Sequence, residues 1–256
     1  MQVDILAFTR PKLVLLRCLM HIGLATALVI GPTNYLWVSL AVYVWFASIG
    51  NSIGQHRYFA HKTFTTSKFW ENILLISATL ASVSSVFGYI VTHREHHKYT
   101  DENKDPHSPH HMTLWQSWTL DLTDTGRWDL RNAKDWIRHN GVMNTHKYFF
   151  AYILTYVIIL AVIDPLLIIY AYLVPASLCV FATGAFNTWG HGKGLKFLGY
   201  RTWSTNDKSV NHHLVNLITL GEGWHNNHHS KPGNWYQGEK WWEWDFNGRV
   251  IQLIKH

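Results

Sequence analysis

Three clusters of histidine, each at the edge of a long apolar stretch, constrain the fold of this chain most strongly. They have the sequences His56-Arg-Tyr-Phe-Ala-His61, His93-Arg-Glu-His-His97 and His225-Asn-Asn-His-His229. A neutral imidazole is a good ligand for first-row transition metals. One such cluster can arise by chance, but three of them, two with the same HxxHH spacing, indicate that the chain folds around metal.

The composition and the placement of charge predict an integral membrane protein. Charged residues make up only 15% of the 256 residues, and the chain contains 14 Trp, 12 Tyr and 12 Phe, a composition typical of chains with aromatic rings at a membrane interface. Lys and Arg are absent between Arg17 and Arg57, between Lys68 and Arg94 and between Lys147 and Lys193, and they flank the histidine clusters instead. The positive-inside rule therefore places the histidines on the cytoplasmic side. No basic cluster stands apart from this pattern, which argues against nucleic-acid binding.

The apolar stretches predict an all-α, multi-pass membrane protein with four transmembrane helices in two hairpins. Residues 13–31 and 35–52 surround a Gly-Pro-Thr-Asn turn, and residues 148–164 and 166–187 surround Asp164-Pro165. A spanning helix needs roughly 20 apolar residues, and proline ends a helix. The chain therefore returns to the cytoplasmic side after each hairpin.

The apolar segment 72–91 lies between the first two histidine clusters and poses a topological problem. If both clusters serve one site, the chain must cross the membrane an even number of times between them, and about 20 residues cannot cross twice. We expect this segment to be one interfacial or re-entrant helix; an ordinary spanning helix is the alternative. Residues 53–71, 92–147 and 188–256 then form a cytosolic helical cap, so that residues 1–256 make up a single membrane domain.

The spacing of the histidines predicts where the metal ligands lie. In HxxHH all three histidines share one face of a helix. On a regular helix His56 and His61 point about 140° apart, so we place His56 on the exposed end of the second helix and His61 just beyond it. A further histidine follows the last apolar stretch, four residues after Asn187. The candidate ligands are His56, His61, His93, His96, His97, His191, His225, His228 and His229.

Nine imidazoles exceed the four ligands of one structural zinc site and suit two metals with open coordination positions. A donor set without thiolates favours iron, copper, nickel or zinc over calcium or magnesium. Ligating histidines usually donate their second ring nitrogen to a carboxylate or carbonyl. The acids near enough in sequence to serve are Glu95, Asp101, Asp105, Asp207 and Glu222.

These residues resemble the membrane-bound fatty acid desaturases, in particular the acyl-CoA desaturase branch. The match runs from Gly54-Gln-His-Arg-Tyr-Phe-Ala-His through the second cluster and Asp105-Pro-His107 to Gly221-Glu-Gly-Trp and the third cluster. The resemblance implies that the nine histidines hold two Fe ions and that Asn187 reaches one of them through water. It also implies an O2-dependent reaction that removes two hydrogens from neighbouring methylenes of a saturated acyl chain and leaves a cis double bond, at about the ninth carbon in the commonest version.

The resemblance leaves the substrate head group and one alternative reaction open. Acyl-CoA-dependent members usually carry a Trp and charged residues where this chain has Phe87-Gly-Tyr-Ile-Val91, so an acyl-CoA, an acyl-lipid and a carrier-protein thioester are all candidate substrates. The chain has no His-Pro-Gly-Gly signature of a fused haem domain, which implies an external electron donor, a ferredoxin or small cytochrome, docking on the basic face. The same ligands would serve a di-iron acyl or alkyl hydroxylase. A metal transporter is disfavoured because the spanning segments offer few polar groups.

Overall fold

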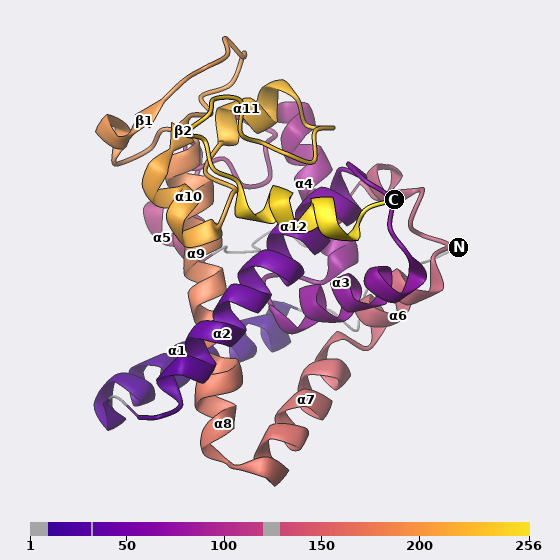
Figure 1. Ribbon diagram of the computed structural model, residues 1–256, viewed down its shortest axis with the longest axis vertical. Coiled ribbons are helices and arrows are strands. Elements are labelled where there is room, and N and C mark those ends of the chain that lie inside the picture. The colour runs from indigo at the N-terminus through magenta and orange to yellow at the C-terminus, as the bar shows by residue number, and fades with distance from the viewer. Residues whose placement is uncertain (1–9, 32, 120–128) are drawn as a thin grey trace.

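The computed structural model describes residues 10–31, 33–119 and 129–256, which are mainly helical (Figure 1). Residues 1–9 of the expected domain and 120–128 of the expected cap lie outside the described residues. In chain order the elements are α1 (Arg10–Ile30), α2 (Leu36–Trp45), η2 (Phe46–Ala60), α3 (Lys68–Leu80), α4 (Val86–Tyr99), α5 (Leu114–Thr119), η3 (Leu130–Ala133), α6 (Asn140–Lys147), α7 (Phe149–Ile163), α8 (Leu166–Ile168), η4 (Ile169–Leu173), α9 (Val174–Gly190), η5 (Lys196–Leu198), β1 (Gly199–Tyr200), β2 (Asn211–His212), α10 (His213–Thr219), α11 (His225–Ser230) and α12 (Phe246–Ile254).

Three helical segments within the described residues are long and apolar enough to cross a membrane: Lys12–Ile30, Leu36–Ala60 and Leu166–Gly190. Helix α7 has 15 residues, about 22 Å at 1.5 Å per residue. It counts as a fourth span only together with α6, from which it is bent by 73°. Large apolar side chains point outward from these helices, as Val29 (88% exposed) and Val162 (81%) do, and an apolar surface of this kind suits contact with lipid. The chain is therefore a membrane protein with three or four candidate spans.

The turns of the two hairpins lie side by side. The Tyr35 hydroxyl at the start of α2 donates a hydrogen bond to the Asp164 carboxylate, which also accepts from the Leu166 N–H at 2.9 Å. The Tyr170 hydroxyl donates to the Gly31 carbonyl at 3.3 Å. Both turns lie at the lower end of Figure 1, whereas α4 and α11, which carry two of the histidine clusters, lie at the upper end. The paired turns thus mark the end of the bundle opposite the histidines.

A wide π-helical turn, η4, interrupts the last spanning segment just before Pro175. Proline has no N–H to donate to the carbonyl four residues earlier, and backbone carbonyls in lipid must find partners within the protein. The Ala171 carbonyl accepts from the Tyr156 hydroxyl at 3.2 Å, and the Tyr170 carbonyl accepts from the Ser39 hydroxyl at 2.5 Å. Neighbouring helices therefore satisfy the groups that the irregular turn exposes.

The segment 72–91, expected to be one helix, is divided between α3 and α4. The chain turns at Ser82, whose φ is +59°, and the Ser85 side chain caps α4 by accepting from the Gly88 N–H at 3.1 Å. Neither helix is among the candidate spans of the described residues, so this segment forms two short helices instead of one long enough to cross a membrane. A capping serine in an apolar stretch explains the break.

Helix α3 packs closely on η2 because η2 carries two glycines on the shared face. A Cβ atom at Gly50 would lie 2.7 Å from the Ser77 carbonyl oxygen, and one at Gly54 would lie 3.0 Å from the Leu74 carbonyl oxygen. Small residues at such an interface allow two backbones to approach. This packing fixes the direction of η2, the segment that carries the first histidine cluster.

The cap contains a small antiparallel sheet as well as the expected helices. Strands β1 and β2 pair with Gly199 opposite His212 and Tyr200 opposite Asn211, and Asn211 also bridges to Trp224. The sheet therefore holds the start of α11, which carries the third cluster, against the chain that follows α9.

Candidate metal centre

The first histidine cluster lies on a helix of unusual winding. Segment η2 is a π-helix, and the His61 N–H donates to the His56 carbonyl five residues earlier at 3.0 Å. In this winding, residues five apart face the same way, so both rings point to one place. His61 lies just beyond the end of the helix, as expected, but the helix continues for four residues past His56 to Ala60, and His56 is buried (2% exposed) instead of exposed. The angle of a regular α-helix does not apply to His56 and His61, because η2 is wound as a π-helix.

The HxxHH clusters do not each form one site but contribute to two. His93 and His97 of α4 converge with His228 of α11, whereas His96 converges with His225 and His229. In each group one ligand atom per residue lies within 4.8 Å of all the others. We name these two sets of histidines the five-histidine group and the four-histidine group. The five-histidine group is His56, His61, His93, His97 and His228. The four-histidine group is His96, His191, His225 and His229.

The ring nitrogens of the five-histidine group approach one another at a spacing that suits one metal ion. The Nε2 atom of His93 lies 2.8 Å from that of His61 and 3.1 Å from that of His97. The Nε2 atom of His228 lies 3.1 Å from those of His97 and His56. A ring nitrogen carries one hydrogen or one lone pair, so hydrogen bonding cannot satisfy two neighbours at once. Nitrogens about 2.1 Å from an ion and at right angles lie about 3.0 Å apart, which fits the observed distances.

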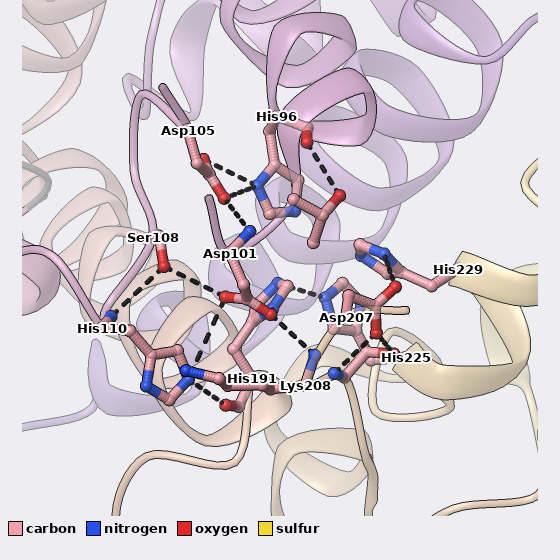
Figure 2. Close-up of polar contacts among 12 residues, drawn as sticks. His96, Asp101, Asp105, Ser108, His110, His191, Asp207, Lys208, His225 and His229 are labelled. Atoms are coloured by element: carbon pink, nitrogen blue, oxygen red, sulfur yellow. Dashed lines mark hydrogen bonds and ion pairs between the residues drawn. The ribbon is translucent and has the colours of Figure 1, made fainter. Parts of the chain in front are cut away.

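The four-histidine group is surrounded by carboxylates (Figure 2). The Nε2 atoms of His191 and His225 lie 2.9 Å apart, and the buried Nε2 atom of His229 has no hydrogen-bond partner. Three of the four histidines present their Nδ1 atom to an aspartate from a loop. These contacts are His96 to Asp105 at 2.8 Å, His191 to Asp101 at 3.1 Å and His229 to Asp207 at 3.1 Å.

In the five-histidine group, His56 lies next to a carboxylate as an ion-pair contact, without the hydrogen-bond geometry of the other three. Its Nδ1 atom lies 2.5 Å from a Glu222 oxygen, and the Ser52 hydroxyl donates to the same carboxylate. Among the expected acids, Glu95 lies elsewhere: its carboxylate accepts from the Asn132 side chain at 3.0 Å. Four of the five acids proposed from the sequence therefore contact candidate ligands.

The protonation states suit metal binding. Burial raises the pKa of the Asp105 carboxyl, but the neighbouring His96 outweighs it and lowers this pKa well below the usual range. Glu222 behaves in the same way next to His56 and Arg57. Burial lowers the pKa of His96 to about 3 despite Asp105. A neutral ring that donates Nδ1–H to an ionised acid leaves its Nε2 lone pair free for a metal. Two divalent cations would also offset the negative charge of these buried acids.

Asn187, proposed to reach a metal through water, lies on α9 one turn before His191. Its side-chain NH2 donates to the His107 carbonyl at 2.7 Å and to the Ser117 hydroxyl at 3.4 Å. The ring of His107 lies 4.3 Å from that of His96, and His96, Asp105 and His107 form a third, overlapping set of metal-binding groups. His107 is not among the candidate ligands proposed from the sequence, although the Asp-Pro-His motif marked the loop that brings it here.

A small cavity of about 20 Å³ lies beside the five-histidine group. Its lining includes the side chains of Ala47, Cys179 and Phe186 from the spanning helices and reaches His56 and Glu222. This volume is enough for about one water molecule. The cavity therefore joins the apolar bundle to the histidines.

Comparison with known proteins gives matches over most of the chain. Residues 31–244 match the family described as fatty acid desaturase. The chain is 29% identical to sn-1 stearoyl-lipid 9-desaturase from Anabaena variabilis, over 92% of this chain and 87% of the relative. It is 30% identical to Delta-9 acyl-lipid desaturase 2 from Arabidopsis thaliana, over 88% and 75%. It is 29% identical to acyl-CoA 5-desaturase AL21 from Anemone leveillei, over 86% and 68%.

Proposed function

The chain belongs to the fatty acid desaturase family and is an oxidoreductase, and from this premise we propose that it inserts a cis double bond near the ninth carbon of a saturated acyl chain. The reaction uses O2 and takes place at two irons held by the nine histidines. The observation that carries the proposal is the sorting of those histidines into two adjacent, buried groups.

The protein's own residues have distinct tasks in this reaction. The nine histidines hold the two ions, and Asp101, Asp105, Asp207 and Glu222 fix the tautomers of four of them. Two reduced irons bound there would activate dioxygen, which the removal of hydrogen from an unactivated methylene requires. Five and four ligands leave open positions in a six-coordinate shell for this purpose. Asn187 is proposed to hold a water against the four-histidine group.

The acyl chain is proposed to reach the histidines at the small cavity beside His56, which would have to widen to receive it. An acyl chain carries no polar mark at its middle, so the protein must measure position from the head group and from the depth of an apolar slot. Ala47, Cys179 and Phe186 provide apolar walls, and the polar end at His56 and Glu222 lies where the reacting methylenes would be placed. Such positioning within a fraction of an ångström supports a large part of the rate.

An acyl-lipid is the proposed substrate class. Two of the three relatives described above are named acyl-lipid or stearoyl-lipid desaturases. Residues Phe87 to Val91 also lack the Trp and charged groups usual in acyl-CoA-dependent members. An acyl-CoA or a carrier-protein thioester is the competing substrate.

We propose that the chain crosses the membrane four times and that residues 1–256 form one domain. The contacts between the two hairpin turns support this topology, because they place both turns on the same side. The basic residues that flank the histidine clusters put the active site on the cytoplasmic side. A separate ferredoxin or small cytochrome is proposed to deliver electrons there.

The function is tested by expression in a host that lacks its own desaturase, followed by mass spectrometry of intact lipids with double-bond localisation. We expect alkenes at the ninth carbon of chains esterified to membrane lipid. Hydroxylated chains without alkenes would replace the proposal with the related hydroxylase. Products confined to acyl-CoA or carrier-protein pools would reject the substrate class.

A further inference from the structure

The side chain of Arg57, which stands between the two histidines of the first cluster, is completely buried. A buried charge is costly unless it is paired and hydrogen-bonded. Its Nε atom donates to Glu222 at 2.9 Å, and its Nη1 atom donates to Asp245 at 2.7 Å and to the Trp235 carbonyl at 2.8 Å. The guanidinium thus joins η2 to two segments more than 160 residues away in the sequence.

Glu222 connects this ion network to the metal centre. One of its oxygens, Oε1, accepts from Arg57, while the other, Oε2, lies 2.5 Å from the His56 Nδ1 atom. The rigid, planar guanidinium donates to Glu222 from Nε and to Asp245 from Nη1, which fixes the position of Glu222 Oε1 relative to Asp245. Holding Oε1 in place therefore leaves Oε2 aimed at His56. Arg57 donates hydrogen bonds to Glu222, Asp245 and Trp235, so it acts on His56 through Glu222.

Asp245 anchors the other side of the network. Its Oδ1 atom caps α12 by accepting from the Gly248 N–H at 2.8 Å, and its Oδ2 atom accepts from the Gln237 N–H at 2.8 Å as well as from Arg57. Gly221 has a φ of +146°, and a Cβ atom there would overlap Asp245 Oδ1. Glycine thus lets the chain next to Glu222 pass close to Asp245.

We propose that Arg57 and Asp245 are positioning residues of the five-histidine group. Through Glu222 they fix the tautomer and the orientation of His56, so the segment from Trp235 to Gly248 is part of the metal centre although it carries no ligand. The inference rests on the proposed function, because it assumes that His56 holds a metal. It adds two residues and a segment near the C-terminus that the ligand pattern alone does not reveal.

The test is a double-mutant cycle on the iron-loaded protein, purified in detergent, with Asp245→Asn, Glu222→Gln and the two combined. Iron affinity is measured by chelator competition, and the two iron environments are followed by ⁵⁷Fe Mössbauer spectroscopy. We expect Asp245→Asn to lower the affinity for one of the two irons by about tenfold, as for other partners of metal ligands. The affinity for the other iron should stay unchanged. In the Glu222→Gln background the same change should have little further effect, because the residues act in series.

A purely structural role predicts a different result. Asp245→Asn would then lower thermal stability and would lower the affinity for both irons in parallel. Its effect on affinity would also add to that of Glu222→Gln. Either that result or an unchanged iron affinity would overturn the inference. If the Asp245→Asn protein does not insert, Arg57→Lys enters the same cycle, because lysine keeps the charge but not the fork of donors.

Two controls separate this inference from the proposed function. Glu239→Gln removes an exposed ion pair with Lys231 and should leave the affinity for both irons unchanged. Wild-type protein that fails to bind two irons would remove the proposed function and this inference with it. Wild-type protein that binds two irons, beside an Asp245→Asn variant of equal affinity, would remove the inference alone.

Discussion

The two histidine groups are adjacent and share α4 and α11, yet they are positioned by different means. The five-histidine group depends mainly on helix geometry, since the π-winding of η2 aligns His56 with His61 and the packing of α3 fixes the direction of η2. The four-histidine group depends on loop carboxylates, which contact three of its four members (Figure 2).

The carboxylates of the four-histidine group are themselves held by the cap. Asp101 accepts from the Lys208 N–H at 2.8 Å and from the Ser108 hydroxyl at 3.0 Å, and Asp207 accepts from the Ser209 N–H at 2.8 Å. Changes in helix packing should therefore affect only the five-histidine group, whereas a change to a carboxylate should affect only the group that this carboxylate contacts. The predictions below test this separation.

The largest effects are expected from removing a ligand of either group. His228→Ala and His229→Ala should each reduce double-bond formation below detection and lose one iron, because both ions are needed to activate O2. Product analysis and iron content of membrane-inserted protein provide the measurement. His256→Ala, at an exposed position, is the matched control and should keep full activity. Sustained turnover in either ligand variant would show that the residue is not a ligand.

The next effect concerns the acids. In the variants Asp105→Asn and Asp207→Asn, the iron affinity of the four-histidine group should fall by about ten- to hundredfold. The iron affinity of the five-histidine group should stay unchanged. Glu222→Gln should do the reverse, because it contacts His56. Chelator competition with ⁵⁷Fe Mössbauer spectra resolves the two ions. Equal weakening of both ions by all three variants would erase the distinction between the groups.

A smaller effect is expected from Gly54→Ala in η2. The added Cβ would lie 2.9 Å from the Ile49 carbonyl oxygen and 3.0 Å from that of Leu74, and overpacking of this kind costs about 1–3 kcal/mol. Thermal unfolding should show the loss of stability, and iron affinity should fall in the five-histidine group only. Gly233→Ala, where a Cβ meets nothing within 4 Å, is the control. Selective weakening of the four-histidine group would contradict the account.

The smallest effect is expected far from both groups. Tyr156→Phe removes the hydrogen bond to the Ala171 carbonyl, and polar contacts of this kind between membrane helices average about 0.6 kcal/mol. Both irons and the product should stay as in the wild type, while the unfolding temperature falls slightly. A change in iron affinity would mean that the bundle and the metal centre are coupled more tightly than the structure indicates.

The sequence predicted much of this arrangement because the signals were local. Apolar stretches bounded by basic residues indicated a membrane protein, and the tight Asp164-Pro165 turn marked the second hairpin. The spacing of the three clusters and the position of His191 identified the residues that the structure gathers together. Acids two to nine residues from a histidine were a sound guide in the case of Asp105, which contacts His96.

Other features depend on tertiary contacts that no local pattern encodes. A regular helix was the natural assumption for η2, and only its packing reveals the wide winding that aligns His56 and His61. The HxxHH spacing predicts that the three histidines of a cluster share one helix face. It does not show that they are divided between two sites. The break before Ser85 was not predicted, because a serine in an apolar stretch can also serve close helix packing. Arg57 carried a signal that was overlooked, since an arginine between two buried ligands needs buried acids as partners.

The most direct test of the account is the metal content and the ⁵⁷Fe Mössbauer spectrum of active wild-type protein extracted from membranes. The account predicts two irons per chain in two distinct nitrogen-rich environments. A single iron per chain in fully active protein, or iron in an environment without histidine nitrogen, would contradict it.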